Sequence, residues 1–313
     1  MNEYNIVAII VTYNRKELLL QCLEAVLGQS YKVKDIILID NASTDGTYEM
    51  LKEKGLLDII KYLRMKKNIG GSGGFYEGIK ESLLFDDDLV WIMDDDTIPC
   101  RDCLENLIIS KNILEGNNEK ISFLASSVYG ENKETMNVPL IDHSTASNGY
   151  EKWYNYLEYG MIRIKSATFV SILVERKAVE KCGLPCKDYF IWGDDSEYTL
   201  RLTKNYGNAY CVGKSKVIHK RTNAKAIDIR YEENYNRLNL YHYYYRNNLI
   251  NSKFYKLSDF PILKALIKNV LYLFKIKGPY KTKKLWQIYR GVWEGIVQYR
   301  MFSSYIKKQL EGK

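Results

Sequence analysis

The sequence predicts an α/β fold built around a mainly parallel β-sheet. Short apolar or β-branched runs occupy residues 6–11, 36–39, 58–63 and 89–93. Helical patterns lie between these runs, and residues 18–27 (LLLQCLEAVL) form the clearest of them. Strands that alternate with helices at this spacing form βαβ units, in which helices cover both faces of the sheet. The 313 residues, 46% of them hydrophobic, provide ample material for such a core.

The pattern changes along the second half of the chain. Residues 167–174 are expected to form a strand and residues 195–204 a helix, and the chain reads as almost wholly helical after Tyr231. We therefore predict an α/β domain over residues 1–220, followed by a helical, basic appendage over residues 221–313.

The positive charge of the chain is concentrated in its last part. Residues 251–313 contain 14 Lys or Arg against 3 Asp or Glu, a formal charge of +11, whereas the whole chain carries +8 and its first 250 residues therefore −3. A basic tail on a mildly acidic body predicts a partner with an anionic surface, either phospholipid or nucleic acid. The start of the chain has an acidic residue and no basic segment, so no signal peptide is expected.

The six cysteines raise the question of a zinc site. They include a C-x-x-C pair, Cys100 and Cys103, and a C-x-x-x-C pair, Cys182 and Cys186. Neither pair lies in a small disulfide-bonded framework, so we expect reduced thiols of a cytoplasmic protein instead of a structural zinc.

Three of the expected strands end in polar residues: Asn14, Asp40 and Asp94. Ligands of open α/β sheets bind at the carboxyl ends of the strands, so these residues are predicted to face one binding edge. Local structure offers a second explanation for two of the segments. Asn14 is a suitable helix N-cap with Glu17 at the capping-box position, and Ser43 or Thr44 could cap the helix after Asp40.

Residues 68–78 (NIGGSGGFYEG) contain five glycines in eleven positions. Such a segment allows the backbone to approach a ligand closely, with N–H groups free to bind phosphate or sugar oxygens. The alternative is a flexible loop at the start of a helix.

Three adjacent carboxylates, Asp94, Asp95 and Asp96, follow the apolar run at residues 89–93. Like charges so close together repel unless a cation lies among them. In an extended segment Asp94 and Asp96 point the same way and Asp95 points away. Asp86, Asp87 and Asp88 precede the same strand, and we expect them to form a solvated turn at the opposite sheet edge.

A second acidic group occupies residues 191–198 (IWGDDSEY). On a helix Asp194 and Glu197 are neighbours, whereas Asp195 lies about 100° round from Asp194, so the three need not share a role. Acidic residues also complement the dipole at a helix start, which is the alternative explanation for each of them.

Taken together, VTYNR at residues 11–15, IDNASTDGT at 39–47 and DDD at 94–96 resemble the inverting family 2 glycosyltransferases. The resemblance covers roughly the first 220 residues and implies a Rossmann-like GT-A fold for them. The glycine-rich segment resembles the galactofuranosyltransferase branch of that family, with some rhamnosyltransferases close by.

The resemblance implies a role for each candidate residue. Asp195 would be the catalytic base, and Trp192, Asp194 and Glu197 would bind the acceptor. Asp94, Asp96 and His219, the last of which follows the apolar segment at 216–218, would hold Mn²⁺ or Mg²⁺, cations that carboxylate oxygens and imidazole suit. The donor would lie against a set from four segments: Thr12, Tyr13, Asn14, Arg15, Asp40, Asn68, Gly70, Gly71, Asp94 and Asp95.

The expected activity is a metal-dependent hexosyltransferase that moves a sugar from a nucleotide-sugar, with UDP-galactofuranose as the best candidate, to a lipid-linked glycan in bacterial surface polysaccharide synthesis. A rhamnosyltransferase using dTDP-rhamnose is the alternative within the family. A nucleotidyltransferase would need a glycine-rich, basic loop after the first strand, and TYNR at residues 12–15 lacks it. A nucleic-acid-binding protein is the alternative from another class, and the basic tail is its basis.

The C-terminal region contributes two further segments. Residues 241–248 (YHYYYRNN) resemble a Y-Y-x-x-R-N element of these transferases, and their alternative role is aromatic packing. Residues 262–276 place Lys264, Lys268 and Lys275 within about 40° of each other on a helical wheel, beside a broad apolar face. This pattern predicts a helix that lies on the anionic inner face of the plasma membrane, or one packed in a helical bundle.

Overall fold

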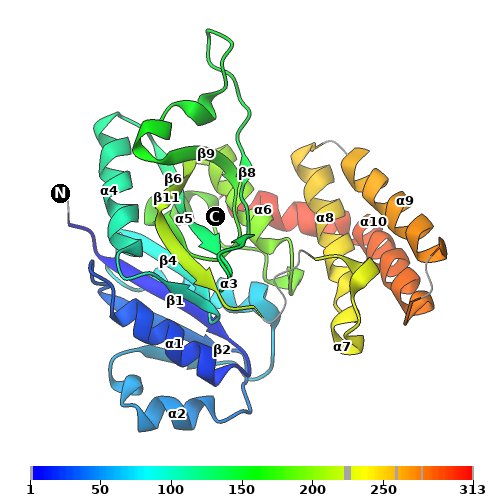
Figure 1. Ribbon diagram of the computed structural model, residues 1–313, viewed down its shortest axis with the longest axis horizontal. Coiled ribbons are helices and arrows are strands. Elements are labelled where there is room, and N and C mark those ends of the chain that lie inside the picture. Colours follow the sequence, from blue (N-terminus) through cyan, green and yellow to red (C-terminus); the bar gives the residue numbers. More distant parts are fainter. Residues whose placement is uncertain (1–2, 222–226, 258–259, 276–277, 312–313) are drawn as a thin grey trace.

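The computed structural model describes residues 3–221, 227–257, 260–275 and 278–311. It consists of an α/β domain and a group of C-terminal helices beside it (Figure 1). The strands are β1 (Ile6–Thr12), β2 (Asp35–Asp40), β3 (Lys61–Arg64), β4 (Leu89–Asp94), β5 (Thr97–Pro99), β6 (Ile121–Tyr129), β7 (Thr135–Met136), β8 (Leu140–Ile141), β9 (Met161–Ser166), β10 (Ile172–Glu175) and β11 (Asn208–His219). The α-helices are α1 (Lys16–Leu27), α2 (Thr47–Glu53), α3 (Gly70–Ser82), α4 (Cys103–Gly116), α5 (Arg176–Cys182), α6 (Asp194–Asn205), α7 (Tyr235–Leu238), α8 (Tyr241–Tyr255), α9 (Phe260–Lys275) and α10 (Lys281–Glu311).

The strands form one sheet in the order β3-β2-β1-β4-β10-β6-β11-β9-β8. Strands β1 to β4 pair in parallel, and so do β6 and β11, whereas β10 runs antiparallel between β4 and β6. The sheet is therefore mixed and mostly parallel, and the predicted α/β class is confirmed.

Alternate residues of β1 explain why helices cover both sheet faces. Ile6, Ala8 and Ile10 pack with α1 and α4 in one apolar cluster. Val7 and Ile9 pack with α3, α5 and α6 in the other. Because successive side chains of a strand point to opposite faces, a continuous apolar strand needs apolar partners on both sides.

Parallel pairing decides where the polar strand ends lie. β11 runs in the same direction as β4, so both carboxyl ends reach the same edge of the sheet. The short strand β5 then turns back and pairs antiparallel with the end of β11, which sets His219 opposite Thr97. This register brings a residue from late in the chain next to Asp96.

Two predicted strands begin later than expected. Residues 56–58 form a short 3-10 helix, and β3 starts only at Lys61. Residues 167–171 form no strand, and β10 starts at Ile172. Ser171 has a φ of 60°, a backbone angle that interrupts an extended strand.

The predicted helix caps are also wrong. α1 has Arg15 as its N-cap and α2 has Gly46, and neither cap residue bonds the helix through its side chain. Asn14, with a φ of 53°, instead accepts a hydrogen bond from the backbone N–H of Thr44. Ser43 accepts one from the N–H of Asn14, so the two predicted caps tie the first two strand ends together.

The acidic segment before β4 is not a simple solvated turn. Asp87 is buried and forms an ion pair with Arg176 at 2.7 Å. Asp88 accepts a hydrogen bond from the backbone N–H of Asn5. Both residues therefore tie down the sheet edge opposite the one where Asp94 lies.

The C-terminal helices pack on one another and reach back to the α/β domain. α10 lies along α8, where Gly291 and Gly295 allow close approach. A Cβ atom at Gly291 would lie 2.5 Å from the carbonyl oxygen of His242, so only glycine fits there. Near its end, Gln309 accepts a hydrogen bond from the N–H of Leu184, in the segment that follows α5.

Candidate active site

A pocket of about 720 Å³ opens at the carboxyl edge of the sheet. Its walls come from the starts of α1 and α3, the ends of β4 and β11, the segment before β10, the start of α6 and residues 227–240. The predicted binding edge of the sheet is thus hollowed in the structure.

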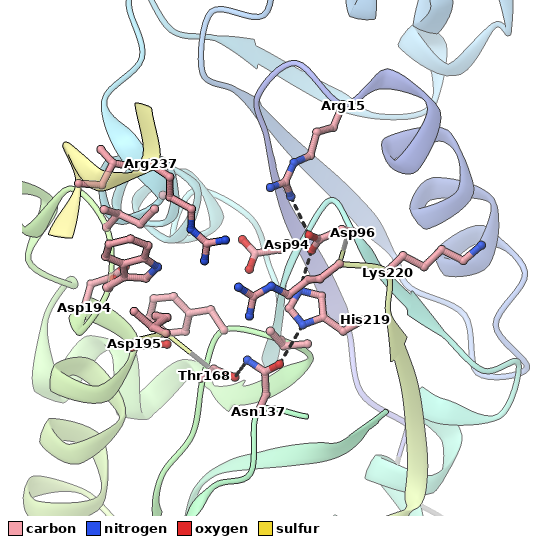
Figure 2. Close-up of a pocket in the computed structure, with 18 of the residues that line it drawn as sticks. Arg15, Asp94, Asp96, Asn137, Thr168, Asp194, Asp195, His219, Lys220 and Arg237 are labelled. Atoms are coloured by element: carbon pink, nitrogen blue, oxygen red, sulfur yellow. Dashed lines mark hydrogen bonds and ion pairs between the residues drawn. The ribbon is translucent and has the colours of Figure 1, made fainter. Parts of the chain in front are cut away.

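Asp94, Asp96 and His219 meet inside this pocket. One potential ligand atom from each lies within 4.8 Å of the others. Figure 2 shows the three side chains close together on one side of the pocket. Two carboxylates and an imidazole form a donor set that suits Mn²⁺, and the carboxylates alone suit Mg²⁺. The residues therefore fit a divalent cation. The strand end predicted the two carboxylates, and the family resemblance implied His219.

A neighbouring asparagine orients His219. Nδ1 of His219 lies 2.9 Å from Oδ1 of Asn137, and Nε2 of His219 lies 2.9 Å from Oδ1 of Asp96. An amide oxygen only accepts, so Nδ1 carries a proton that it donates to Asn137. Such a second partner fixes the ring so that Nε2 faces the position where a metal would bind.

Arg15 supplies the nearest positive charge to the acidic cluster. Its Nη1 lies 2.7 Å from Asp96 and 3.1 Å from Asp95. Asp95 also accepts a hydrogen bond from Oγ1 of Thr12 at 2.7 Å. Residues 95 and 96 form a turn between β4 and β5, so the alternation of an extended segment does not apply to them, and Asp95 and Asp96 both contact Arg15. The bond from Thr12 also ties Asp95 to the end of β1.

The two carboxylates of the cluster differ in acidity. Burial, followed by repulsion from Asp96 and Asp95, raises the pKa of Asp94 well above its usual value. Burial would also raise the pKa of Asp96, but the hydrogen bond and charge of His219 outweigh it and lower that pKa. A buried carboxyl that is hard to ionise favours a cation beside it, which is the environment that a metal ligand needs.

Asp194 and Asp195 enter the pocket from the start of α6, across from Asp96 and His219 (Figure 2). Burial, followed by the charge of Asp195, raises the pKa of Asp194 to about 7. Burial also raises the pKa of Asp195, although the N–H of Ser196 donates to its Oδ1 and opposes the change. A carboxylate with a raised pKa is a stronger base than an exposed one.

Two arginines that the sequence motifs did not indicate also line the pocket. Arg221 follows His219 by two residues, and Arg237 lies on α7. Burial, followed by repulsion from Arg237, lowers the pKa of Arg221. Within the described ranges, no carboxylate lies within ion-pair distance of Arg221. The pocket therefore combines acidic metal-ligand candidates with cations that favour an anionic ligand.

The family model for glycosyl transferase family 2 matches residues 7–170, more than half of the chain.

The chain belongs to glycosyl transferase family 2.

Among characterised relatives, this family 2 glycosyltransferase is similar to galactofuranosyltransferase GlfT1 of Mycolicibacterium smegmatis, with 32% identity over 103 residues. The match covers 33% of this chain and 33% of the relative, so it spans only a third of each.

Two solved glycosyltransferase structures align over most of both chains. One is the mannosyltransferase PcManGT from Pyrobaculum calidifontis in complex with GDP-Man and Mn²⁺, with a TM-score of 0.54, 15% identity and coverage of 95% of this chain and 87% of that one. The other is S. aureus TarS in complex with UDP-GlcNAc, with a TM-score of 0.56, 12% identity and coverage of 98% and 88%. The predicted GT-A fold and glycosyltransferase class are confirmed.

Not every residue expected to bind the donor lines the pocket of this family 2 glycosyltransferase. Arg15, Gly71 and Asp94 do. Tyr13 is exposed beside the pocket, and its backbone N–H lies 3.4 Å from Asp95. Asn68 accepts a hydrogen bond from the N–H of Gly70 and so starts α3.

The structure corrects the prediction that Asp40 binds the donor. Asp40 is fully buried, and both of its carboxylate oxygens are used inside the protein, by the N–H of Ser43 at 2.7 Å and the hydroxyl of Tyr62 at 2.6 Å. Because the side chain is fully buried, neither oxygen is exposed to a base. Asp40 therefore shapes the turn after β2 and does not face the pocket.

The structure also corrects the prediction that Glu197 binds the acceptor. Glu197 lies on the buried face of α6 with 0% exposure and forms a two-point ion pair with Arg201, at 2.8 and 3.0 Å. Tyr255 of α8 donates a third hydrogen bond to it at 2.7 Å. The i+3 spacing predicted a shared face with Asp194, but the helix turns Glu197 into the core and away from the pocket.

The glycine-rich segment mostly packs instead of binding. A Cβ atom at Gly74 would lie 2.5 Å from Val11, and one at Gly78 would lie 2.4 Å from Ile9. These glycines let α3 lie directly on the sheet. Gly71 differs, because it has open space around it and lines the pocket. The predicted ligand contact of this segment is thus limited to the first turn of α3.

Proposed function

We propose that this glycosyltransferase transfers a hexosyl group from a nucleotide-sugar to a hydroxyl acceptor with inversion at the anomeric carbon. The observation that carries the proposal is the pairing, in one pocket, of the Asp94, Asp96 and His219 cluster with the carboxylates of Asp194 and Asp195 on the opposite wall. A displacement from the back of the sugar needs a base on one side and stabilisation of the leaving group on the other.

We assign the base to Asp195. Its half-buried carboxylate, whose pKa is raised, would accept the proton of the acceptor hydroxyl as that oxygen attacks the sugar. Asp194 and Trp192, which also line the pocket, would contact the acceptor. The indole of Trp192 packs edge-on against Tyr241, so its ring is held in one orientation.

The donor diphosphate would lie near the acidic cluster. Asp94, Asp96 and His219 would hold Mn²⁺ or Mg²⁺ there, and the ion would offset the negative charge of the departing diphosphate. Arg15 bonds Asp95 and Asp96 in this structure. Because its side chain is half exposed, it could turn from these carboxylates toward a bound phosphate. The manganese and nucleotide-sugars present in the similar solved structures support this arrangement.

UDP-galactofuranose is our best candidate for the donor. The support is the similarity to GlfT1, whose name states that it is a galactofuranosyltransferase, together with the glycine-rich segment. The acceptor would be a lipid-linked glycan of bacterial surface polysaccharide synthesis.

The C-terminal helices provide a surface suited to such an acceptor. Lys264, Lys268 and Lys275 of α9 are exposed. The opposite side of α10 from its packed face exposes six large residues, at 56–59% each: Trp286, Tyr289, Trp293, Ile296, Val297 and Met301. No helix in the described part of the chain is long and apolar enough to cross a bilayer. We propose that these two helices lie on the cytoplasmic face of the plasma membrane.

A donor panel tests the proposed function. Purified protein would be incubated with UDP-galactofuranose, UDP-galactopyranose and dTDP-rhamnose, each with Mn²⁺ or Mg²⁺ and a soluble glycan acceptor, and nucleotide release would be followed. We expect release from UDP-galactofuranose with an inverted product. Nucleotide release from dTDP-rhamnose alone would show that the donor is dTDP-rhamnose and not UDP-galactofuranose. No nucleotide release from any donor of a wider panel would contradict the proposed transferase activity.

A further inference from the structure

The loop at residues 188–193 carries the acceptor side of the site, and its backbone is strained. Phe190 and Trp192 have φ values of 66° and 61°, in the left-handed region, and Gly193 has 95°. Residues other than glycine rarely adopt positive φ values, because their Cβ atom then comes too close to the backbone. Two such residues within three positions persist only where the surroundings hold them.

Helix α8 supplies most of that support, through side chains that donate to the carbonyl groups of the loop. Nδ2 of Asn247 lies 2.7 to 3.1 Å from three carbonyl oxygens, those of residues 189, 191 and 192. Asn251, one turn later, donates to the carbonyl of Gly193 at 2.8 Å. Arg246 donates to the carbonyls of residues 188 and 189, at 2.8 and 3.1 Å.

Helix α3 closes the loop from the other side. The backbone N–H of Ser72 donates to the carbonyl of Phe190 at 3.2 Å. A Cβ atom at Gly70 would lie 2.1 Å from the same carbonyl oxygen, so glycine is required at this position. Every carbonyl from residue 188 to residue 193 therefore accepts a hydrogen bond from α3, α8 or α6.

The donors on α8 do not reach the pocket. Arg246, Asn247 and Asn251 are buried, with exposures of 6%, 0% and 4%, and none of them lines the pocket. Loop carbonyls left unpaired in this interior would destabilise the conformation of the loop. The polar residues of this helix thus have a role different from the aromatic packing of Tyr241 and Tyr245 beside them.

We propose that Arg246, Asn247 and Asn251 are positioning residues of the transferase. By fixing the loop they hold Trp192 at the pocket and set where α6 begins, and so where the carboxylate of Asp195 lies. This inference rests on the proposed function through the role of Asp195. It assigns to the C-terminal region a direct part in forming the active site.

Kinetics of Asn247→Ala and Asn251→Ala test the proposal. A base displaced by about 1 Å costs on the order of 100-fold in rate. We expect kcat to fall at least tenfold in both variants, while the affinity for UDP in the presence of Mn²⁺, measured by calorimetry, stays within twofold of wild type. Asn248→Ala is the matched control, because among the residues that the structure describes the side chain of Asn248 bonds only the carbonyl of Tyr244, within its own helix.

Two outcomes would overturn the proposal: unchanged kcat in both variants, or a parallel loss of UDP affinity and kcat, which would indicate general damage. Hydrogen exchange adds a readout that needs no turnover. Amides of residues 189–196 should exchange faster in the Asn251→Ala protein, whereas those of residues 92–97 should not. Unchanged exchange at 189–196 would also overturn it. A wild-type protein without turnover would contradict the proposed function, and exchange would still decide the positioning role.

Discussion

At the scale of single residues, the chemistry depends on which carboxylates ionise. Four carboxylates line one pocket, of which Asp96 and Asp194 are buried and Asp94 and Asp195 are half-buried. Loss of solvation is the first cause that raises the pKa in three of them, Asp94, Asp194 and Asp195. Asp96 is the exception, because His219 and Arg15 stabilise its charge. We therefore expect Asp96 to carry its negative charge at any pH at which the protein is active, and Asp195 to gain one as the pH rises.

The substitution Asp195→Asn tests the proposed base. Asparagine has nearly the same shape but cannot accept the proton of the acceptor, so turnover should fall by roughly 10²–10⁴-fold. The affinity for UDP with Mn²⁺ should not change, because Asp195 lies on the opposite wall from the metal ligands. Calorimetry and a nucleotide-release assay would measure the two quantities. Turnover close to that of wild type would move the base to Asp194.

The pH profile of kcat follows from the same carboxylate. Asp195 acts as a base only when it is deprotonated, so activity should be lost as the pH falls through its pKa. Burial raises that pKa from 3.8, and the acid limb of the profile should therefore lie clearly above pH 3.8. A limb at the ordinary aspartate value would show that the base is a solvated carboxylate. Asp195→Asn should abolish the limb.

The sequence predicted the residues of the site whose position follows from strand geometry. Asp94 ends β4 and Asp96 lies in the turn that follows, and the pairing of β5 with β11 brings His219, which the family resemblance implied, next to them. Asn137, Arg221 and Arg237 were missed, because they lie outside regular patterns and reach the pocket only through tertiary packing. Asp40 was predicted to face the pocket, and local hydrogen bonds to Ser43 and Tyr62 turn it inward.

At the scale of elements, some strands and helices have the bounds that we predicted, and others begin several residues later. β1 and α6 lie within a residue of their expected bounds. β3 and β10 start three and five residues late, where a 3-10 turn and the left-handed Ser171 replace the extended backbone. Apolar composition is compatible with both outcomes, and only tertiary pairing decides between them.

The glycines of α3 allow a matched test of packing against binding. Gly74→Ala places a methyl group 2.5 Å from Val11 and should destabilise the fold by about 1–3 kcal/mol. Gly71→Ala meets open space and should stabilise the helix by up to about 1 kcal/mol. Denaturant unfolding measures both changes. Gly71→Ala should also weaken UDP binding, because Gly71 lines the pocket. Equal unfolding midpoints for the two variants would refute the packing role of Gly74.

At the scale of the whole molecule, the two regions depend on each other. The boundary that we predicted at residue 220 remains a prediction. Across it, α8 holds the loop before α6, and the end of α10 bonds the segment after α5. Tyr305 of α10 donates to the carbonyl of Pro185 in the same segment. One side of α10 therefore packs on helices that support the active site, while the other side exposes two tryptophans.

Vesicle flotation tests the membrane surface. Replacing Lys264, Lys268 and Lys275 by Glu should detach the protein from vesicles of anionic lipid, since exposed charges are attracted over about 10 Å at 0.1 M salt. A Trp286→Ser, Trp293→Ser variant should weaken binding at high salt as well, because it removes apolar contact. Activity on a soluble acceptor should change little in either case. Wild-type protein that does not float with anionic vesicles at low salt would contradict the membrane proposal.

The measurement that tests the account most directly is UDP binding with and without Mn²⁺, compared between wild type, Asp96→Ala and Asp88→Ala. Asp96 lies in the pocket, whereas Asp88 lies at the opposite end of β4 and serves as the control. We predict that UDP binds wild type and Asp88→Ala tightly only when Mn²⁺ is present, and that Asp96→Ala loses this dependence together with most of the affinity. UDP affinity that is the same with Mn²⁺ and with EDTA, or equal in the two variants, would contradict the metal-assisted transfer proposed for this pocket.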